Sequence, residues 1–306
     1  GKGTLFNPVG KLTPTDPTVR SPVADDRYLG AWSVDGHLLV GNMQRITVHW
    51  RPLFRPSVLL IDPVPLPGYV VFGEPEYPGT TFSEGNYGVH YEVFSPLLDL
   101  SLYWFQGYHH WPGIRFESVE LDGERLSPVE LRLRQKAYRI SMAGADFSIP
   151  LGSWIFRMEG AWQHTQKYVA DKEYLPLSEL SYLGELERAG SWWTVVAGYH
   201  GKHIIDYFTA EAQPTLTTGE DMMTALLKEG VVPTADAVDQ LIRDQVSAFN
   251  RLYNAQLREF YHTLFVHLRA GWLNDRLEVE FPLVFQMSTE EWMIRPEIAY
   301  NPGSGI

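Results

Sequence analysis

Residues 261–286 form a long amphipathic hairpin, and this hairpin most constrains how the chain can fold. Its first arm reads YHTLFVHLRAGW, its turn LNDR and its second arm LEVEFPLVFQ. Apolar and mostly polar residues alternate along both arms, which predicts two strands because successive strand side chains point to opposite faces. Each arm holds roughly 10–12 alternating residues, long enough to cross a bilayer at a tilt. The apolar face of the first arm carries Leu264, Val266, Leu268, Ala270 and Trp272.

Half-buried sheets of soluble β-sandwiches alternate in the same way, so the connection lengths decide between the two folds. Short turns are expected near residues 35, 96, 151, 201 and 273. Long connections are expected at 51–85, 108–130, 167–190 and 214–255. Regular exchange of short turns and long loops is typical of outer-membrane barrels, and sandwiches have no reason to segregate loop lengths. The pattern therefore favours an all-β, antiparallel transmembrane β-barrel.

Eleven strands can be assigned from alternation, and two positions need special turns. Asp35-Gly36 and Gly201-Lys202 are predicted hairpin turns, and a β-bulge at Gly144 would reconcile a change of phase within 131–149. Bacterial single-chain barrels have an even number of strands and no open edge in lipid. We therefore expect a single barrel domain over 1–306 that lacks strands at both ends. The predicted strands are 27–34, 38–50, 86–94, 99–107, 131–149, 154–166, 192–200, 203–213, 261–272, 277–286 and 292–300.

Composition and motifs narrow the function. The net charge of −12 argues against nucleic acid as a partner, and zero cysteines exclude disulfides and thiolate metal sites. No apolar run approaches the length of about 18 residues that a helical membrane span needs. His109-His110 and His200-x-x-His203 lack a third ligand at a recognisable spacing, and no G-x-S-x-G motif is present. We expect no enzyme activity, no metal and no cofactor.

Five segments carry a family likeness. They read LFNPVGKLTPTD, RITVHWRPLFRPS, YGVHYEVFSPLLDLSLYWFQGYHHWP, YRISMAGADFSIPLGSWIFRMEGAWQHT and MIRPEIAYNP. In this order they resemble the porin-like outer-membrane barrels of Gram-negative bacteria, near the alginate-export type. The resemblance implies a bacterial outer-membrane location, a lipid bilayer around the barrel, short periplasmic turns, long extracellular loops and a monomeric or trimeric channel. The helical insertion at 214–255 departs from the family pattern, and both ends of the family barrel are missing.

If the apolar faces contact lipid, the opposite faces line a lumen. Charged side chains set ion selectivity in such pores, whereas opposite charges on neighbouring strands can instead pair as structural ladders. The Pro-rich loop 51–85 is a candidate constriction, with a cover folded outward as its alternative. The pore-lining candidates are Arg45, His49, Arg51, Arg55, Arg157, Glu159, His267, Arg269, Glu278, Glu280, Arg295 and Glu297.

The sequence thus predicts an outer-membrane channel for passive or substrate-selective diffusion of small hydrophilic solutes, with anionic or sugar-like solutes as candidates. Two alternatives stay open. One is a secreted, aromatic-rich β-protein that binds or cleaves carbohydrate, and the other is a non-conducting barrel that scaffolds partner proteins. Helices are predicted at 219–229 and 235–253, where they form an extracellular cap with a buried apolar stripe. A lumen plug or a docking surface for a partner protein is the alternative. A homo-oligomer is the other expected assembly.

Overall fold

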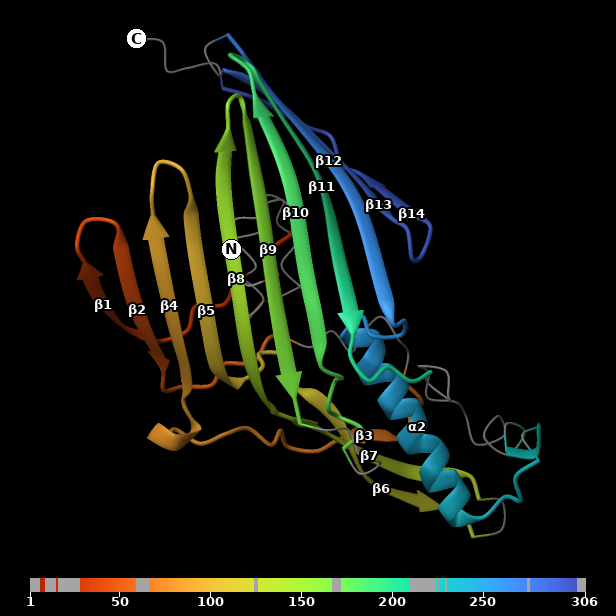
Figure 1. Ribbon diagram of the computed structural model, residues 1–306. Coiled ribbons are helices and arrows are strands. Elements are labelled where there is room, and N and C mark those ends of the chain that lie inside the picture. The colour runs from red at the N-terminus through yellow and green to blue at the C-terminus, as the bar shows by residue number, and fades with distance from the viewer. Residues whose placement is uncertain are drawn as a thin grey trace.

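A large, curved antiparallel sheet dominates the computed structural model (Figure 1). The structure describes residues 6–8, 15, 28–58, 66–123, 126–166, 172–209, 224, 226–228, 230–273 and 276–301. A second, three-stranded sheet and a helix lie together at one end of the large sheet. The all-β, antiparallel fold class predicted from alternation is therefore confirmed.

Strands of the large sheet follow one another almost in chain order, as hairpins do. Each is hydrogen-bonded to the next, and β5 and β8 are neighbours because β6 and β7 belong to the second sheet. The strands are β1 (Val34–Val40), β2 (Gln44–Arg51), β4 (Asn86–Phe94), β5 (Asp99–Tyr108), β8 (Arg139–Leu151), β9 (Trp154–Thr165), β10 (Glu179–Ala189), β11 (Trp193–Ile204), β12 (Phe260–Trp272), β13 (Leu277–Gln286), β14 (Glu291–Ile294) and β15 (Glu297–Tyr300).

Strands β14 and β15 pair with two consecutive stretches of β13. Ile294 opposes Leu283 and Glu297 opposes Glu280, so the register does not change between the two halves. The interruption coincides with Pro296 and with Pro282 on β13, because proline has no backbone N–H to donate. The predicted strand 292–300 is therefore present but divided.

The large sheet is open. Within the described residues, β1 at one edge and β14 with β15 at the other each pair with a single neighbouring strand. The predicted barrel closure is thus not a feature of this structure, which shows a curved wall (Figure 1).

Most short turns lie at one end of the large sheet and the long connections at the other, whereas the short turn 287–290 between β13 and β14 lies at the long-connection end (Figure 1). The short end has the turns at 41–43, 95–98, 152–153 and 190–192 and the brief connection between β12 and β13. Gly41 and Gly152 both have φ +64, a left-handed conformation that glycine adopts without steric cost and that fits tight hairpins. The long end has the connections between β2 and β4, β5 and β8, β9 and β10, and β11 and β12.

Two predicted turns are wrong. Asp35 and Gly36 lie inside β1, where they oppose His49 and Val48 of β2. Likewise, β11 runs without interruption through the second predicted turn, Gly201-Lys202. The predicted loop 167–190 contains β10, and the predicted strand 203–213 extends only to Ile204 within the described residues.

The predicted bulge at Gly144 is also wrong. Gly144 pairs directly with Tyr103 of β5 and Ala161 of β9, and both registers run through it unchanged. The change of phase has a different cause. Ile140 and Met142 are buried on the opposite face from Phe147, where side chains from the long connections cover them.

The second sheet and the helix are assembled from three of the long connections. The second sheet contains β3 (Val70–Phe72), β7 (Pro128–Lys136) and β6 (Gly113–Leu121). In it, β3 is parallel to β7 and β6 is antiparallel to β7. The helix α2 (Ala235–Tyr253) packs against β6 and buries Val238, Ile242 and Val246. Thr234 caps α2, because its hydroxyl accepts the Ala237 N–H at 3.2 Å. The predicted strand 131–149 is thereby split between the two sheets.

Two insertion segments can be compared with their predictions. The Pro-rich loop 51–85 supplies β3 and the short 3-10 helix η2 (Phe82–Glu84), while residues 59–65 lie outside the described residues. The described β3 thus pairs in the second sheet. Of the predicted helix 219–229, residues 224 and 226–228 are helical, and the others lie outside the described residues. The second predicted helix, 235–253, matches α2.

Candidate functional site

The two faces of the large sheet have opposite chemistry. We call the face that carries Glu92, Asp146 and Glu159 the inner face, and the other the outer face. Asp146 is 0% exposed and Glu159 3%, whereas Leu264 on the outer face is 46% exposed. Soluble proteins normally bury their apolar faces and leave carboxylates in water. Here several inner-face carboxylates are buried and many large apolar side chains of the outer face are exposed, while the covered parts of the inner face also bury apolar side chains such as Phe105 and Ile140.

A single transverse row of directly opposed residues crosses the inner face from β2 to β13. Every neighbouring pair in the row is a registered cross-strand pair, so these side chains lie side by side across nine strands. Three of them are carboxylates on neighbouring or nearly neighbouring strands, and Leu183 is the one large aliphatic. The row reads Arg45, Glu92, Ser101, Asp146, Glu159, Leu183, His200, Thr263 and Gln286.

Many inner-face charges are held by a specific partner. Arg45 Nε lies 2.5 Å from Glu92 Oε2, and the Tyr103 hydroxyl donates to Asp146. These contacts fix the rotamers of side chains that would otherwise be mobile. Charge-assisted hydrogen bonds are also stronger than neutral ones, which offsets part of the cost of burial.

Two further ion pairs lie on β9, β10 and β11. Arg157 Nη1 is 2.6 Å from Glu187 Oε2, and Lys202 Nζ is 2.7 Å from Glu179 Oε2. Lys202 also donates to the Asn254 carbonyl at 2.7 Å, so it joins the inner face to the end of α2.

Carboxylates outnumber basic side chains on the inner face. Register places the strand carboxylates there at Asp35, Glu92, Asp99, Asp146, Glu159, Glu179, Glu185, Glu187, Glu278, Glu280, Glu291 and Glu297. The same register places the strand arginine and lysine side chains at Arg45, Arg51, Arg157, Lys202 and Arg269. The surface therefore carries an acidic excess even when paired groups are included.

Most sequence-predicted pore-lining residues lie on the inner face. Arg55 does not: it lies beyond β2, and its Nη1 donates to the Gly30 carbonyl at 2.5 Å. Arg295 lies between β14 and β15, and its N–H donates to the Pro282 carbonyl at 3.3 Å. Those on inner-face strand positions are Arg45, His49, Arg51, Arg157, Glu159, His267, Arg269, Glu278, Glu280 and Glu297.

Four predicted residues come together as a charge ladder near the short-turn end. Arg269 Nη2 lies 3.1 Å from Glu278 and Arg269 Nε lies 3.4 Å from Glu280. His267 Nε2 lies 3.6 Å from the same Glu280. This arrangement corresponds to the structural-ladder role that the sequence offered as an alternative to selectivity.

Sequence reasoning missed Asp146 and the carboxylates of β10. The apolar residues before Asp146, Ile140 and Met142, lie on the same inner face as Asp146. Alternation in the sequence therefore assigned Asp146 to the apolar, lipid-facing side of the strand. In β10, Leu180, Leu183 and Leu186 occupy both faces and hide the alternation. The signal that could have found this strand is the period-two run of Glu185 and Glu187.

An aromatic side chain from the N-terminal stretch lies on the inner face. The Phe6 ring stacks on His200 with centroids 4.7 Å apart and is 5.3 Å from the Phe265 ring. It packs against the buried cluster that includes Leu183 and Val196. Part of the inner surface is therefore covered by residues 6–8 of the same chain.

Buried polar clasps tie the second sheet and α2 to the end of the large sheet. Asn250 Nδ2 donates to the carbonyls of Ile114 and Glu173 at 2.7 and 2.9 Å, and its Oδ1 accepts the Ile114 N–H at 2.7 Å. The Glu173 carboxylate accepts the Phe116 N–H at 2.7 Å and lies 3.6 Å from Arg243. Burial raises the pKa of Glu173, because desolvation outweighs these favourable contacts.

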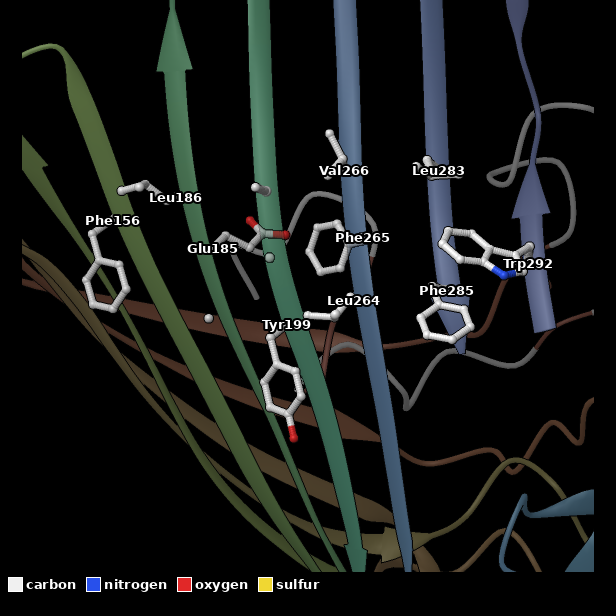
Figure 2. Close-up of a pocket in the computed structure, with 13 residues that line it drawn as sticks. Phe156, Glu185, Leu186, Tyr199, Leu264, Phe265, Val266, Leu283, Phe285 and Trp292 are labelled. Atoms are coloured by element: carbon white, nitrogen blue, oxygen red, sulfur yellow. The ribbon is translucent and has the colours of Figure 1, made fainter. Parts of the chain in front are cut away.

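The outer face contains an apolar groove of about 620 Å³ over β9 to β14. Small residues at Gly184 and Ala197 form a depression among large side chains, and the lining comes mainly from the outer face. Figure 2 shows the bulky lining residues Phe156, Leu186, Tyr199, Leu264, Phe285 and Trp292, which belong to successive strands.

The histidines considered as metal ligands have other partners. His110 Nδ1 lies 2.7 Å from Ser57 Oγ, and His109 Nδ1 lies 3.0 Å from the Tyr138 hydroxyl. In the part of the chain that the structure describes, no group of three or more His, Asp or Glu side chains is arranged to hold a metal. Nor does any helix there have the length and apolar character needed to cross a membrane.

No protein-family model matches this chain, and no curated protein matches it in sequence.

Proposed function

We propose that this chain forms the wall of an outer-membrane β-barrel channel of a Gram-negative bacterium, with the inner face toward a water-filled lumen and the outer face toward lipid. The observation that carries the proposal is the inverted polarity of the large sheet. Large apolar side chains are exposed along the outer face, while carboxylates are sequestered on the inner face. An apolar surface that spans many strands would be an aggregation hazard in water and is the required surface in lipid.

The dimensions of the outer face support the same proposal. Outer-face side chains of β12 run from Leu264 to Trp272, which corresponds to roughly 26 Å along the strand at about 3.3 Å per residue and to roughly 20 Å of height at a strand tilt of about 40°. The apolar band of an outer-membrane barrel is about 25 Å tall. At the short-turn end, Trp192 and Trp272 lie with ring centroids 5.5 Å apart, as in an interfacial aromatic girdle.

Inner-face charge favours cations and neutral hydrophilic solutes over anions. Carboxylate rings select for cations in pores, and the acidic residues of this face outnumber its arginines and lysines. Anionic solutes, one of the candidates suggested by the sequence, are therefore the less suitable permeants. Neutral, sugar-like solutes remain compatible with this surface.

Planar-bilayer conductance with a KCl gradient tests the proposal. We expect steady channels whose reversal potential has the sign of cation selectivity. Glu280→Gln removes an inner-face charge whose side chain is 37% exposed and should reduce this selectivity, whereas the outer-face control Leu268→Val should leave it unchanged. A protein that stays monodisperse without detergent and does not insert into bilayers would overturn the channel. Channels that select anions would overturn the proposed cation selectivity but not the proposed channel.

A further inference from the structure

A second cavity opens on the outer face, where β9, β10 and β11 reach the long-connection end of the sheet. Its volume is about 610 Å³, and it differs from the groove of Figure 2 in having many polar side chains. Aromatic rings and hydrogen-bonding groups line the same space, contributed by Trp162, His164, Gln166, Ser178, Asp206 and Phe208. These residues lie at the ends of three adjacent strands and in the connection after β11.

The two large aromatic side chains of this cavity are each fixed by a neighbour and still accessible. Trp162 is 44% exposed, and the His164 ring stacks on it with centroids 5.5 Å apart and planes at 22°. Phe208 is 40% exposed, and the guanidinium of Arg251 lies 4.6 Å from its ring centroid. Arg251 itself is only 2% exposed, so it supports the ring from within the protein. Such pre-positioned rings lose little conformational entropy when a ligand covers them.

Hydrogen-bonding groups are fixed beside these rings. Ser178 Oγ accepts the Thr165 N–H at 3.1 Å and lies 3.2 Å from His164 Nδ1. Asp206 has φ +54, a left-handed conformation that aspartate tolerates better than most residues. This turn places an exposed carboxylate at the cavity, and within the described residues no hydrogen bond or ion pair occupies it.

We propose that this cavity binds the ring of a neutral carbohydrate. A sugar ring has apolar C–H faces that pack on aromatic rings, and hydroxyl groups at its rim that donate to carboxylate and amide oxygens. Both requirements are met here, by Trp162 with Phe208 and by Asp206 with Gln166. Pockets of this size that combine apolar rings with fixed polar groups are typical small-molecule sites.

Other ligand classes fit less well. Asp206 would repel a phosphate or another anion at close range. A hydrocarbon chain would remove water from Asp206 and Gln166 without replacing their hydrogen bonds. A quaternary ammonium would meet the positive field of Arg251 behind the Phe208 ring. The sugar can be a free oligosaccharide or the head group of a glycolipid, since the cavity lies where the outer face meets the long connections.

Binding can be measured without reference to conductance, so this proposal and the proposed channel fail independently. The protein is purified in an amine-oxide detergent, because sugar-based detergents would compete. It is titrated calorimetrically with maltotriose, cellotriose and lactose up to about 10 mM, a limit at which even weak sites with millimolar Kd are visible. We expect saturable binding of at least one of these sugars. Absence of saturable binding for all three would overturn the proposal.

Variants locate the binding. Trp162→Ala should raise the Kd by about tenfold or more, and Trp162→Phe should restore most of the affinity because it keeps an aromatic face. Asp206→Asn keeps a residue that accepts φ +54 and removes the charge, so the Kd should rise by about three- to tenfold at an unchanged Tm. Trp292→Ala alters an outer-face tryptophan outside this cavity and should have no effect. Sugar binding that survives Trp162→Ala would overturn the assignment.

Two additional experiments distinguish a free sugar from a glycolipid head group, and a sugar from a quaternary ammonium ligand. Nanodiscs with and without a neutral glycolipid are compared: if the glycolipid weakens apparent oligosaccharide affinity, its head group shares the site, and if it does not, the ligand is a free sugar. Choline is titrated under the same conditions. If the protein binds choline but no sugar, and Trp162→Ala abolishes choline binding, the cavity is a quaternary ammonium site and the carbohydrate proposal is overturned.

Discussion

Asp146 of β8 and Glu159 of β9 directly oppose each other across two hydrogen-bonded strands, and both are almost completely buried. Like charges at directly opposed positions destabilise a sheet. The repulsion within this pair is therefore expected to lower the stability of the sheet.

Glu159→Gln should therefore stabilise the folded protein. Removing one of the two opposed charges is expected to raise the free energy of unfolding by about 0.5 kcal/mol, within the range measured for cross-strand pairs. Urea unfolding in detergent at low and high salt measures it, and the gain should change little with salt because buried charges are screened weakly. Glu291→Gln, at the exposed edge strand, is the matched control. A lower stability of Glu159→Gln would indicate that its hydrogen bonds outweigh the repulsion.

Asn250→Ala should loosen the helix and the second sheet from the large sheet. The substitution removes hydrogen bonds to Ile114 and Glu173 and leaves buried backbone groups without partners. The local free energy of opening should fall by about 2–4 kcal/mol, since each unsatisfied buried group costs about 1–3 kcal/mol. Hydrogen exchange of the α2 amides reports this change. Gln240→Ala, which loses one exposed bond to Asp244, should change exchange little.

The stability of the same region should fall as pH rises from about 4.5. Burial raises the pKa of Glu173 above its model-compound value of 4.5, so the folded state binds more protons than the unfolded state just above that pH. Stability is then highest below the unfolded pKa and declines until pH passes the folded pKa. Glu173→Gln keeps an acceptor for the Phe116 N–H and should flatten this dependence. An unchanged slope in hydrogen-exchange stability of α2 between pH 4 and 7 would contradict the assignment.

Phe6→Ala should uncover part of the inner face. Loss of the ring contacts with His200 and Phe265 should lower the free energy of unfolding by about 0.5–1.5 kcal/mol, the range for aromatic pairs. If the inner face lines a lumen, single-channel conductance should rise, because Phe6 then no longer narrows the path. Phe6→Leu retains most of the volume and should change conductance less. Equal conductance in all three proteins would place the permeation path elsewhere.

Sequence alternation predicted most strands because their outer faces are mostly apolar over the middle of each strand. The hairpin of β12 and β13 was predicted almost to the residue, and Arg269 with Glu278 was predicted as a cross-strand ladder. The failures share one physical cause. Where the long connections cover the inner face, as at Ile140 and Leu183, apolar side chains occur on both faces and alternation is lost.

Turn prediction failed for a related reason. Asp35-Gly36 has the chemistry of a tight turn, yet strand pairing over the whole hairpin shifts the turn to Gly41. The second sheet was beyond reach of local patterns, because β3, β6, β7 and α2 come from three separate connections. The carboxylates of β10 were missed together with their strand.

The union of three long connections into one packed unit gives the two ends of the wall different mechanical behaviour. At the long-connection end, strands far apart in the chain are cross-braced by a shared apolar core and by clasps such as Asn250. At the opposite end, each turn joins only its own two strands, so neighbouring hairpins are held together by ladder hydrogen bonds and by pairwise side-chain contacts such as Trp192 with Trp272. Under heat or applied force, neighbouring hairpins of the wall should therefore separate first at the short-turn end and last at the long-connection end.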